Sequence, residues 1–264
     1  MRVNVISIVG SDREKTALAR LTKMGFAVDL FPAFDFRERQ IAELDGIANL
    51  QEFSKRYARL PSAGEIGCSL SHLSLIKSMK MTAGKDYQVI FEDDALPKVS
   101  GREFQRICDE LSDSPFDVIL LGYSKVDEET ESYINVVNPF YPLHRVADGS
   151  HAVGARYSEG FTGAVGYLVK KSAIVKFARL EKVEHVADDW CFFSSLGLRI
   201  GHISPMLVEE DYARTKSTLG HDFVFPIRFH NIIGVKWIRR AMGALRSILL
   251  GIRCRVEYGL RRRE

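Results

Sequence analysis

The first 34 residues alternate between apolar and polar stretches in a way that predicts a strand, a helix and a second strand. Residues 3–9 are rich in β-branched side chains, and the Gly-Ser-Asp turn that follows is typical of a helix start. Leu18, Leu21 and Met24 then mark one apolar face at helical spacing, and residues 26–34 return as a strand. This order predicts neighbouring strands of a parallel sheet.

The same alternation continues through most of the chain. We expect helices over about 65–81, 102–111, 172–180 and 188–197, and strands over 87–91, 117–121, 163–169 and 200–208. Residues 133–146 are irregular and aromatic, which is more typical of loops or edge strands. The predicted fold class is therefore α/β, with a mostly parallel, Rossmann-like sheet flanked by helices over residues 1–229 and a basic helical tail over 230–264.

The net charge of +3 is unevenly distributed along the chain. Residues 234–264 hold nine Lys or Arg and two acidic residues, a net of +7, which leaves −4 for the rest. Between 235 and 252, apolar residues alternate with Lys and Arg, as in amphipathic helices that bind an anionic membrane surface. A helix packed on its own domain would show a similar pattern. Nucleic-acid binding is not expected, because the tail has no recognisable reading motif and the body is acidic.

The composition predicts a cytoplasmic protein, peripheral on the inner face of the inner (plasma) membrane. The apolar run at 241–252 has twelve residues and contains Arg246, whereas a membrane-spanning helix needs roughly 20. The four cysteines form no Cys-x-x-Cys pair, so we expect free thiols in a reducing compartment. The start of the chain has no secretory signal pattern.

Three consecutive acidic residues follow the predicted strand at 87–91. Carboxylates at the carboxyl end of a parallel strand lie where open α/β sheets bind ligands. Because alternate residues of an extended segment point the same way, Glu92 and Asp94 are expected to face one site. Their oxygens suit Mg²⁺ or Mn²⁺, which can bridge the phosphates of a nucleoside diphosphate. The alternative is a solvated acidic turn in which Asp94 caps a helix.

Two further segments are candidates for chemistry. The stretch 64–72, GEIGCSLSH, places small residues near a helix start, where backbone can approach a ligand or another segment closely. Tight packing, with His72 as a core or surface histidine, explains it equally well. The pair Asp188-Asp189 precedes Trp190 and fits a helix N-terminus. It also fits a general base that activates a sugar hydroxyl.

The order of these segments resembles glycosyltransferase family 25, the lipooligosaccharide biosynthesis galactosyltransferases. The motifs GEIGCSLSH (64–72) and VIFEDDA (89–95) are the specific part, and the resemblance covers residues 1 to about 211. It implies a GT-A type fold, a UDP-sugar donor, Mn²⁺ or Mg²⁺, and inversion at the anomeric carbon.

The resemblance also implies roles for single residues. Glu92 and Asp94 are expected to bind the metal ion and the donor, with Asp93 between them. Asp188 is the expected base, because it lines up best with the family's later aspartate, and Asp189 is the second choice. Both stay candidates, because this chain has Val186-Ala187 where the family often shows a proline and a valine. Further expected donor contacts are Ile6, Ser7, Arg13, Glu65 and His72, and His221 is the expected third metal ligand.

Three functions are consistent with these features. The leading hypothesis is an inverting, metal-dependent transferase that moves a hexose, galactose from UDP-galactose in β-1,4 linkage, onto the growing oligosaccharide of lipopolysaccharide or lipooligosaccharide. A Mg²⁺-dependent phosphohydrolase would use the same acidic strand end without an acceptor. A non-enzymatic adaptor at the membrane surface would use the acidic clusters only as helix caps.

Overall fold

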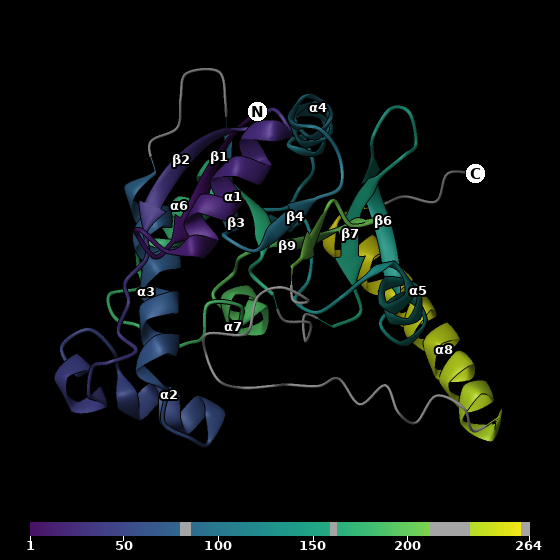
Figure 1. The fold of residues 1–264 in the computed structure, drawn as a ribbon. Coiled ribbons are helices and arrows are strands. Elements are labelled where there is room, and N and C mark those ends of the chain that lie inside the picture. The colour runs from purple at the N-terminus through teal and green to yellow at the C-terminus, as the bar shows by residue number, and fades with distance from the viewer. Residues whose placement is uncertain (80–85, 159–162, 212–232, 260–264) are drawn as a thin grey trace.

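The chain is built around one eight-stranded sheet with the strand order β2-β1-β3-β8-β5-β9-β7-β6. A computed structural model describes residues 1–79, 86–158, 163–211 and 233–259 (Figure 1). The strands of the sheet are β1 (Arg2–Ser7), β2 (Ala27–Pro32), β3 (Tyr87–Glu92), β5 (Val118–Leu120), β6 (Phe140–Arg145), β7 (Ala152–Arg156), β8 (Gly166–Lys170) and β9 (Ile200–Ser204). The short strands β4 (Ala95–Pro97) and β10 (Val208–Glu210) pair with each other in a second, antiparallel sheet.

Most strands of the main sheet run in one direction. β1 is parallel to β2 and β3, and β5 is parallel to β9. β8 lies antiparallel between β3 and β5, and β7 lies antiparallel between β9 and β6. The predicted α/β class with a mostly parallel sheet is therefore confirmed, and the reversed strands β8 and β7 are features that the hydrophobic pattern did not indicate.

Helices cover both faces of this sheet. The helices of the described residues are α1 (Asp12–Lys23), the 3₁₀ helix η1 (Ile41–Leu44), α2 (Leu50–Tyr57), α3 (Ala63–Ser78), α4 (Gly101–Leu111), α5 (Glu128–Val137), α6 (Lys171–Phe177), α7 (Trp190–Ser195) and α8 (Ile233–Glu257). Alternate residues of β3 enter different cores: Val89 and Phe91 pack with α1 and α4, whereas Ile90 packs with α3, α6 and α7. A smaller core lies between η1 and α3.

The predicted elements at the N-terminus form where the sequence places them. The Ser11 hydroxyl accepts a hydrogen bond from the Glu14 N–H and caps α1. At α3, Ser62 and Glu65 form a reciprocal capping box, which fixes the first turn of the helix that carries GEIGCSLSH. Gly67 lies against the backbone of Phe34, and a Cβ at this position would overlap the Phe34 carbonyl oxygen. The small residue therefore lets α3 approach the segment after β2.

Two sequence predictions were wrong in detail. Within 133–146 the expected edge strand is confirmed, because β6 is the last strand of the sheet, but residues 133–137 belong to α5, where loops or edge strands were expected. The side chain of Asp127 caps α5, and the aromatic and β-branched residues that follow obscured the helix. The predicted strand 200–208 is interrupted at Pro205, which has no N–H to donate to a ladder, so β9 and β10 belong to different sheets.

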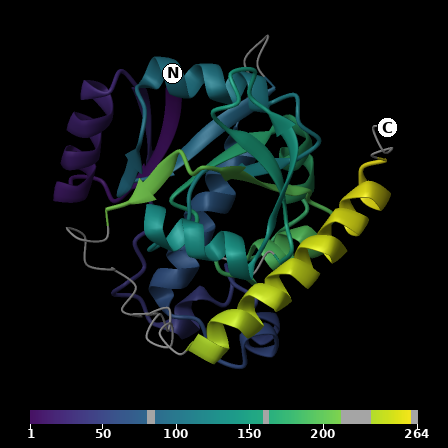
Figure 2. The ribbon, with the colours of Figure 1, turned by 90° about the vertical axis from the view of Figure 1, so that its right-hand side faces the viewer.

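The long helix α8 lies along the outside of the molecule, beside α5, β6 and β7 (Figures 1 and 2). Leu250 and Cys254 are buried against the domain, and Gly243 lets the helix approach the Val136 carbonyl closely. No helix among the described residues is long and apolar enough to cross a membrane. The predicted boundary at residue 229 lies outside the described residues.

Candidate active site

The acidic segment 92–94 lies at the carboxyl ends of β1 and β3, in the middle of the molecule. Glu92 is the last residue of β3 and pairs in register with Ile6 of β1. Asp93 and Asp94 form the turn between β3 and β4, and the Asp211 N–H donates to the Asp94 carbonyl at 2.9 Å. The predicted position of this cluster at a sheet edge is therefore the position that the structure shows.

The two aspartates share one cation from the start of α1. Arg13 Nη2 lies 2.5 Å from Asp93 Oδ1 and 2.7 Å from Asp94 Oδ2. Ser7 Oγ donates to the other Asp93 oxygen at 2.6 Å. The sequence predicted that Glu92 and Asp94 belong to one extended segment, but the extended segment ends at Glu92, and residues 93–94 form a turn. As a result Asp93 and Asp94 pair with Arg13, and Glu92 contacts His72 of α3, although Glu92 and Asp94 lie close enough for the charge of Glu92 to raise the pKa of Asp94.

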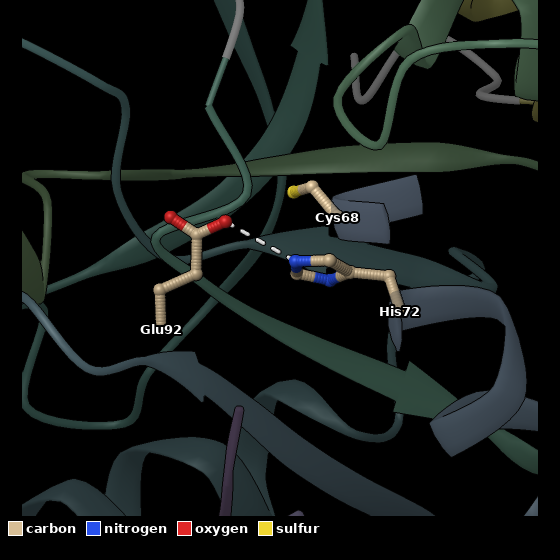
Figure 3. Close-up of side chains that lie close together, drawn as sticks. All are labelled: Cys68, His72 and Glu92. Carbon is tan, nitrogen blue, oxygen red and sulfur yellow. Dashed lines mark hydrogen bonds and ion pairs between the residues drawn. The ribbon is translucent and has the colours of Figure 1, made fainter. Parts of the chain in front are cut away.

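Glu92 contacts a histidine of the GEIGCSLSH segment. Its Oε1 lies 3.1 Å from His72 Nε2, and His72 Nδ1 lies 2.7 Å from the Tyr167 hydroxyl in β8. His72 is buried, whereas the side chain of Glu92 is 25% exposed. One turn before His72, Cys68 points its thiol toward the same carboxylate (Figure 3). The potential ligand atoms of Cys68, His72 and Glu92 all lie within 4.8 Å of one another.

The site holds more negative charge than its described cations compensate. Burial, together with the nearby carboxylates of Glu210 and Asp188, raises the pKa of Glu92 to about 8. Burial and the charge of Glu92 raise the pKa of Asp94 to about 8, although Arg13 opposes the shift. Buried Asp94 Oδ1 has no hydrogen-bond partner among the described residues. Such an arrangement favours an added cation, so Glu92 and Asp94 fit a divalent ion with oxygen ligands.

Burial also keeps the neighbouring histidine neutral. It lowers the pKa of His72 to about 4, and the negative charge of Asp188 only partly offsets this shift. A neutral imidazole leaves one ring nitrogen as an acceptor, which is the form that can accept a proton or bind a metal ion. His72 therefore adds no positive charge to the acidic cluster at neutral pH.

Asp188 and Asp189 have different surroundings although they are adjacent. Asp189 is the N-cap of α7: its Oδ1 accepts the Phe192 N–H at 2.9 Å, and its Oδ2 accepts the Tyr57 hydroxyl at 2.5 Å. Asp188 lies near His72 and Glu92, and burial raises its pKa, with the backbone groups of Gly163 and Asp188 itself opposing the shift. Asp188 thus faces the acidic cluster, and Asp189 is engaged in holding the loop.

The remaining predicted residues are spread around this centre. Ile6 is buried in the core beside β3, and Glu65 is engaged by Arg59 at 2.5 and 2.8 Å as well as by the capping box. Arg13, Ser7 and His72 lie next to the acidic segment. His221 lies outside the described residues, so its expected role as a metal ligand stays a prediction.

Sequence reasoning missed three residues of this centre. Cys68 stands four residues before His72 on one helix, a spacing that places both side chains on the same face. Glu210 is the last residue of β10 and adds negative charge near Glu92 and Asp94, and its carboxylate accepts the Lys125 N–H at 2.8 Å. Tyr167 reaches His72 only because β8 pairs with β3, which no local pattern reveals.

A family model described as "Glycosyltransferase family 25 (LPS biosynthesis protein)" matches residues 1–192. The match spans β1 to α7 and includes the acidic segment, the GEIGCSLSH helix and the Asp188 loop. The chain belongs to glycosyltransferase family 25. A "Glycosyltransferase 25 family member" of Aedes aegypti is 27% identical over 128 residues, which are 47% of this chain and 21% of the relative. The chain thus matches about a fifth of the length of that curated relative.

Two solved structures show a distant likeness in fold. The "Crystal Structure of A197 from STIV" covers 78% of this chain and 82% of its own at 15% identity, with a TM-score of 0.36. The structure of HddC from Yersinia pseudotuberculosis covers 76% and 88% at 11% identity, with a TM-score of 0.33. Likeness at this level carries no argument about function.

Proposed function

We propose that this chain is an inverting, metal-dependent glycosyltransferase that moves a hexose from a UDP-sugar onto a glycan acceptor. In its most specific form, the proposal is transfer of galactose from UDP-galactose, in β-1,4 linkage, onto the growing oligosaccharide of lipopolysaccharide or lipooligosaccharide. The observation that carries the proposal is the buried Asp94 Oδ1, which has no partner among the described residues and lies in an acidic cluster at the carboxyl edge of the sheet. Family membership supports the same reaction class.

Glu92 and Asp94 are the residues that would hold the Mn²⁺ or Mg²⁺ ion. When bound, the ion supplies positive charge that stabilises the diphosphate of the leaving UDP. Arg13 fixes the acidic turn through Asp93 and Asp94, with Ser7 holding the second oxygen of Asp93. These contacts position Asp94 before the donor arrives, so little reorganisation is needed on binding.

Asp188 is the residue best placed to act as the general base. Burial raises the pKa of Asp188 above that of an ordinary aspartate and toward neutral pH. A base whose pKa lies closer to the working pH abstracts a proton from an acceptor hydroxyl more readily. Asp189 already accepts hydrogen bonds from Tyr57 and the α7 backbone. We therefore assign proton abstraction to Asp188 and loop positioning to Asp189. A single displacement follows, in which the acceptor oxygen attacks C1 as the bond to UDP breaks.

The test is calorimetric titration of UDP, UDP-galactose, UDP-glucose and UDP-N-acetylglucosamine into the protein with Mn²⁺ and then with EDTA. We expect metal-dependent binding of UDP and of one sugar nucleotide, UDP-galactose, and loss of that binding in Asp94→Asn. Glu103→Gln is the matched control and should retain binding, because Glu103 is a carboxylate of α4 that pairs with Arg106. Absence of binding in folded protein would contradict the proposal. Phosphate release from simple esters without an acceptor would instead indicate a phosphohydrolase.

The outer face of α8 supports the proposal that the enzyme works at an anionic membrane surface. Six large apolar residues recur at helical spacing and are 45–78% exposed: Met242, Leu245, Ile248, Leu249, Ile252 and Val256. They lie opposite Leu250 and Cys254, which pack on the domain. Arg240 and Arg255 are exposed on the same helix, so positive charge accompanies the apolar stripe. A peripheral position on the inner face of the plasma membrane would bring the enzyme to a lipid-linked acceptor.

Vesicle binding tests this location separately from catalysis. The full chain should bind vesicles that contain phosphatidylglycerol and bind neutral phosphatidylcholine vesicles at least about tenfold more weakly. The double variant Leu245→Glu/Ile252→Glu should lose binding, and Ala244→Glu, exposed but off the stripe, should retain it. Equal binding by both variants would contradict the proposal. A stable dimer that is lost in the double variant would show that a second copy covers the stripe.

A further inference from the structure

Glu92 belongs to two different sets of possible metal ligands. On one side it shares the acidic turn with Asp94, a set made only of oxygen atoms. On the other side its carboxylate lies beside the ring nitrogen of His72 and the sulfur of Cys68 (Figure 3). We propose that Cys68, His72 and Glu92 form a second metal site, which binds a thiophilic divalent ion of the Zn²⁺ class.

The backbone already brings these three ligands together. Cys68 and His72 are one turn apart on α3, so both side chains leave the same face of the helix. Glu92 reaches them from the end of β3, and the three ligand atoms lie within 4.8 Å of one another. A tetrahedral zinc ion, with bonds of about 2.0–2.3 Å, would draw them to about 3.5 Å apart. Side-chain rotation of Cys68 and Glu92 supplies that movement, since both are partly exposed.

The second contact of His72 resembles the support that metal-binding histidines receive. The Tyr167 hydroxyl lies 2.7 Å from Nδ1 and fixes the plane of the ring. When Nδ1 donates its hydrogen to the Tyr167 oxygen, Nε2 presents its lone pair to the Glu92 carboxylate 3.1 Å away. Two acceptors at this distance need a proton or a cation between them. A metal ion at this point satisfies both, and Tyr167 acts as a positioning residue.

The chemistry of this set distinguishes it from the acidic turn. A thiolate and an imidazole prefer Zn²⁺ and its thiophilic neighbours, whereas oxygen-only sites suit Mg²⁺ and Mn²⁺. Since Glu92 is common to both sets, occupation by Zn²⁺ removes it from the hard-metal site. The consequence, which rests on the proposed function, is that Zn²⁺ inhibits metal-dependent donor binding in competition with Mn²⁺.

Metal binding without any nucleotide tests the site directly. Metal-stripped protein is titrated with Zn²⁺ by calorimetry and with Co²⁺ by absorption spectroscopy. We expect one equivalent of either ion to bind, with a thiolate-to-cobalt charge-transfer band in the near ultraviolet. Cys68→Ser should abolish the band and lower Zn²⁺ affinity by at least about 100-fold, and Tyr167→Phe should lower it by about 10- to 100-fold. The matched control is Cys191→Ser, because Cys191 is an exposed cysteine of α7 outside the proposed ligand set.

Several outcomes would overturn the inference. They are a cobalt spectrum without a thiolate band in folded wild-type protein, a Cys68→Ser variant that binds Zn²⁺ as tightly as the wild type, or loss of the band in Asp94→Asn. The last result would show that Asp94 also ligates the thiolate-bound ion, so that the two sets of ligands would form one site. Retention of the band in Asp94→Asn, together with loss of Mn²⁺-dependent UDP binding, would support both sites independently. Absence of UDP binding in every protein would contradict the proposed function and leave the cobalt result standing.

Discussion

Buried carboxylates lie at both ends of the parallel strands, at the amino edge and at the carboxyl edge of the sheet, and their pKa values shift in opposite directions. Asp117 precedes β5 at one edge, and its oxygens accept hydrogen bonds from Ser172 at 2.6 Å, Lys176 at 2.7 Å and the Arg199 N–H at 2.8 Å. Burial alone would raise the pKa of Asp117, but these donors lower it to about 2. At the other edge, where β3 ends, the pKa values of Glu92 and Asp94 are raised to about 8.

The difference separates a structural carboxylate from carboxylates that await a ligand. Asp117 is 1% exposed and ties β5 to α6 and to the segment before β9, so its charge is compensated within the fold. Glu92 lies near the carboxylates of Asp188 and Glu210, Asp94 lies near those of Glu92 and Glu210, and Arg13 pairs with the acidic turn. Groups with strongly perturbed pKa values in such surroundings concentrate at functional sites. The comparison therefore predicts opposite consequences for activity and stability when each carboxylate is neutralised.

The largest expected effect is a contrast between two variants: Asp94→Asn should lose activity and keep stability, and Asp117→Asn should lose stability and keep activity. Asp94→Asn should lower the transfer rate by at least about 1000-fold, because it removes a ligand of the proposed ion, and should change the free energy of unfolding by less than about 1 kcal/mol. Asp117→Asn should retain the transfer rate and lose roughly 2–3 kcal/mol of stability, because Lys176 and Arg199 lose their counter-charge. Steady-state transfer assays and urea unfolding measure the two quantities.

The outcome that contradicts this prediction is the reverse pattern. If Asp94→Asn mainly unfolded the protein, Asp94 would be a structural cap like Asp117. Glu103→Gln is a suitable control for both measurements, because the side chain of Glu103 on α4 is 44% exposed and its ion pair with Arg106 is open to solvent. Its stability change should stay within about 0.5 kcal/mol.

The next effect concerns the adjacent pair at the start of α7. Asp188→Asn should lower kcat by about 100-fold or more while the affinity for UDP stays near that of the wild type, since proton abstraction is lost and donor binding is not. Asp189→Asn should lower stability by about 1–2 kcal/mol through the weakened cap and the Tyr57 contact, with a smaller change in kcat. Single-turnover rates and thermal unfolding separate the two. A loss of kcat confined to Asp189→Asn would assign the base to Asp189.

A smaller effect is the pH dependence of stability, which has opposite signs at the two edges. The pKa of folded Asp117 lies below its unfolded value of about 3.9, so its contribution is present above pH 4 and is lost as the pH falls toward 2. The raised pKa values of Glu92 and Asp94 give a contribution that is full below about pH 4 and is lost as the pH rises through about 8. In EDTA, the melting temperature should fall by several degrees between pH 5 and 9.

The double variant Glu92→Gln/Asp94→Asn provides the comparison for this measurement. Its melting temperature should change little between pH 5 and 9 and should still fall at acidic pH, where Asp117 is protonated. Asp117→Asn should lose the fall at acidic pH and keep the fall at alkaline pH. Parallel curves for the wild type and the double variant between pH 5 and 9 would show that the two carboxylates do not carry raised pKa values in solution.

The features that the sequence predicts are those that depend on residues close together along the chain. The strand–helix–strand start and the acidic segment after β3 are readable because period, capping residues and strand ends are encoded within a few positions. The hydrophobic pattern also predicted the strand at 163–169, but it carries no sign of direction, and the antiparallel insertion of β8 is what brings Tyr167 to His72.

The partners of single carboxylates depend on contacts between distant segments. The sequence makes Asp189 a candidate base, but in the structure the hydroxyl of Tyr57, 132 residues away, donates a hydrogen bond to its Oδ2. Glu65 likewise reads as a donor contact, yet Arg59 and the first turn of α3 engage it. A sequence shows which residues are acidic and where strands end, whereas compensation of each charge is a property of the packed fold.

The smallest expected effect is that of Ser7→Ala. This variant tests whether the hydrogen bond from Ser7 to the Asp93 carboxylate contributes to donor binding or to stability. Ser7 donates to one oxygen of Asp93 at 2.6 Å, and Arg13 holds the other at 2.5 Å. Because Arg13 remains, we expect a loss of about 1 kcal/mol in stability and a rise of less than tenfold in KM for the UDP-sugar, with kcat unchanged. Ser7→Thr, which keeps the hydroxyl, should restore KM. A hundredfold loss of kcat in Ser7→Ala would instead show that this hydroxyl contacts the reacting donor, and the compensated part of the cluster would then belong to the catalytic machinery.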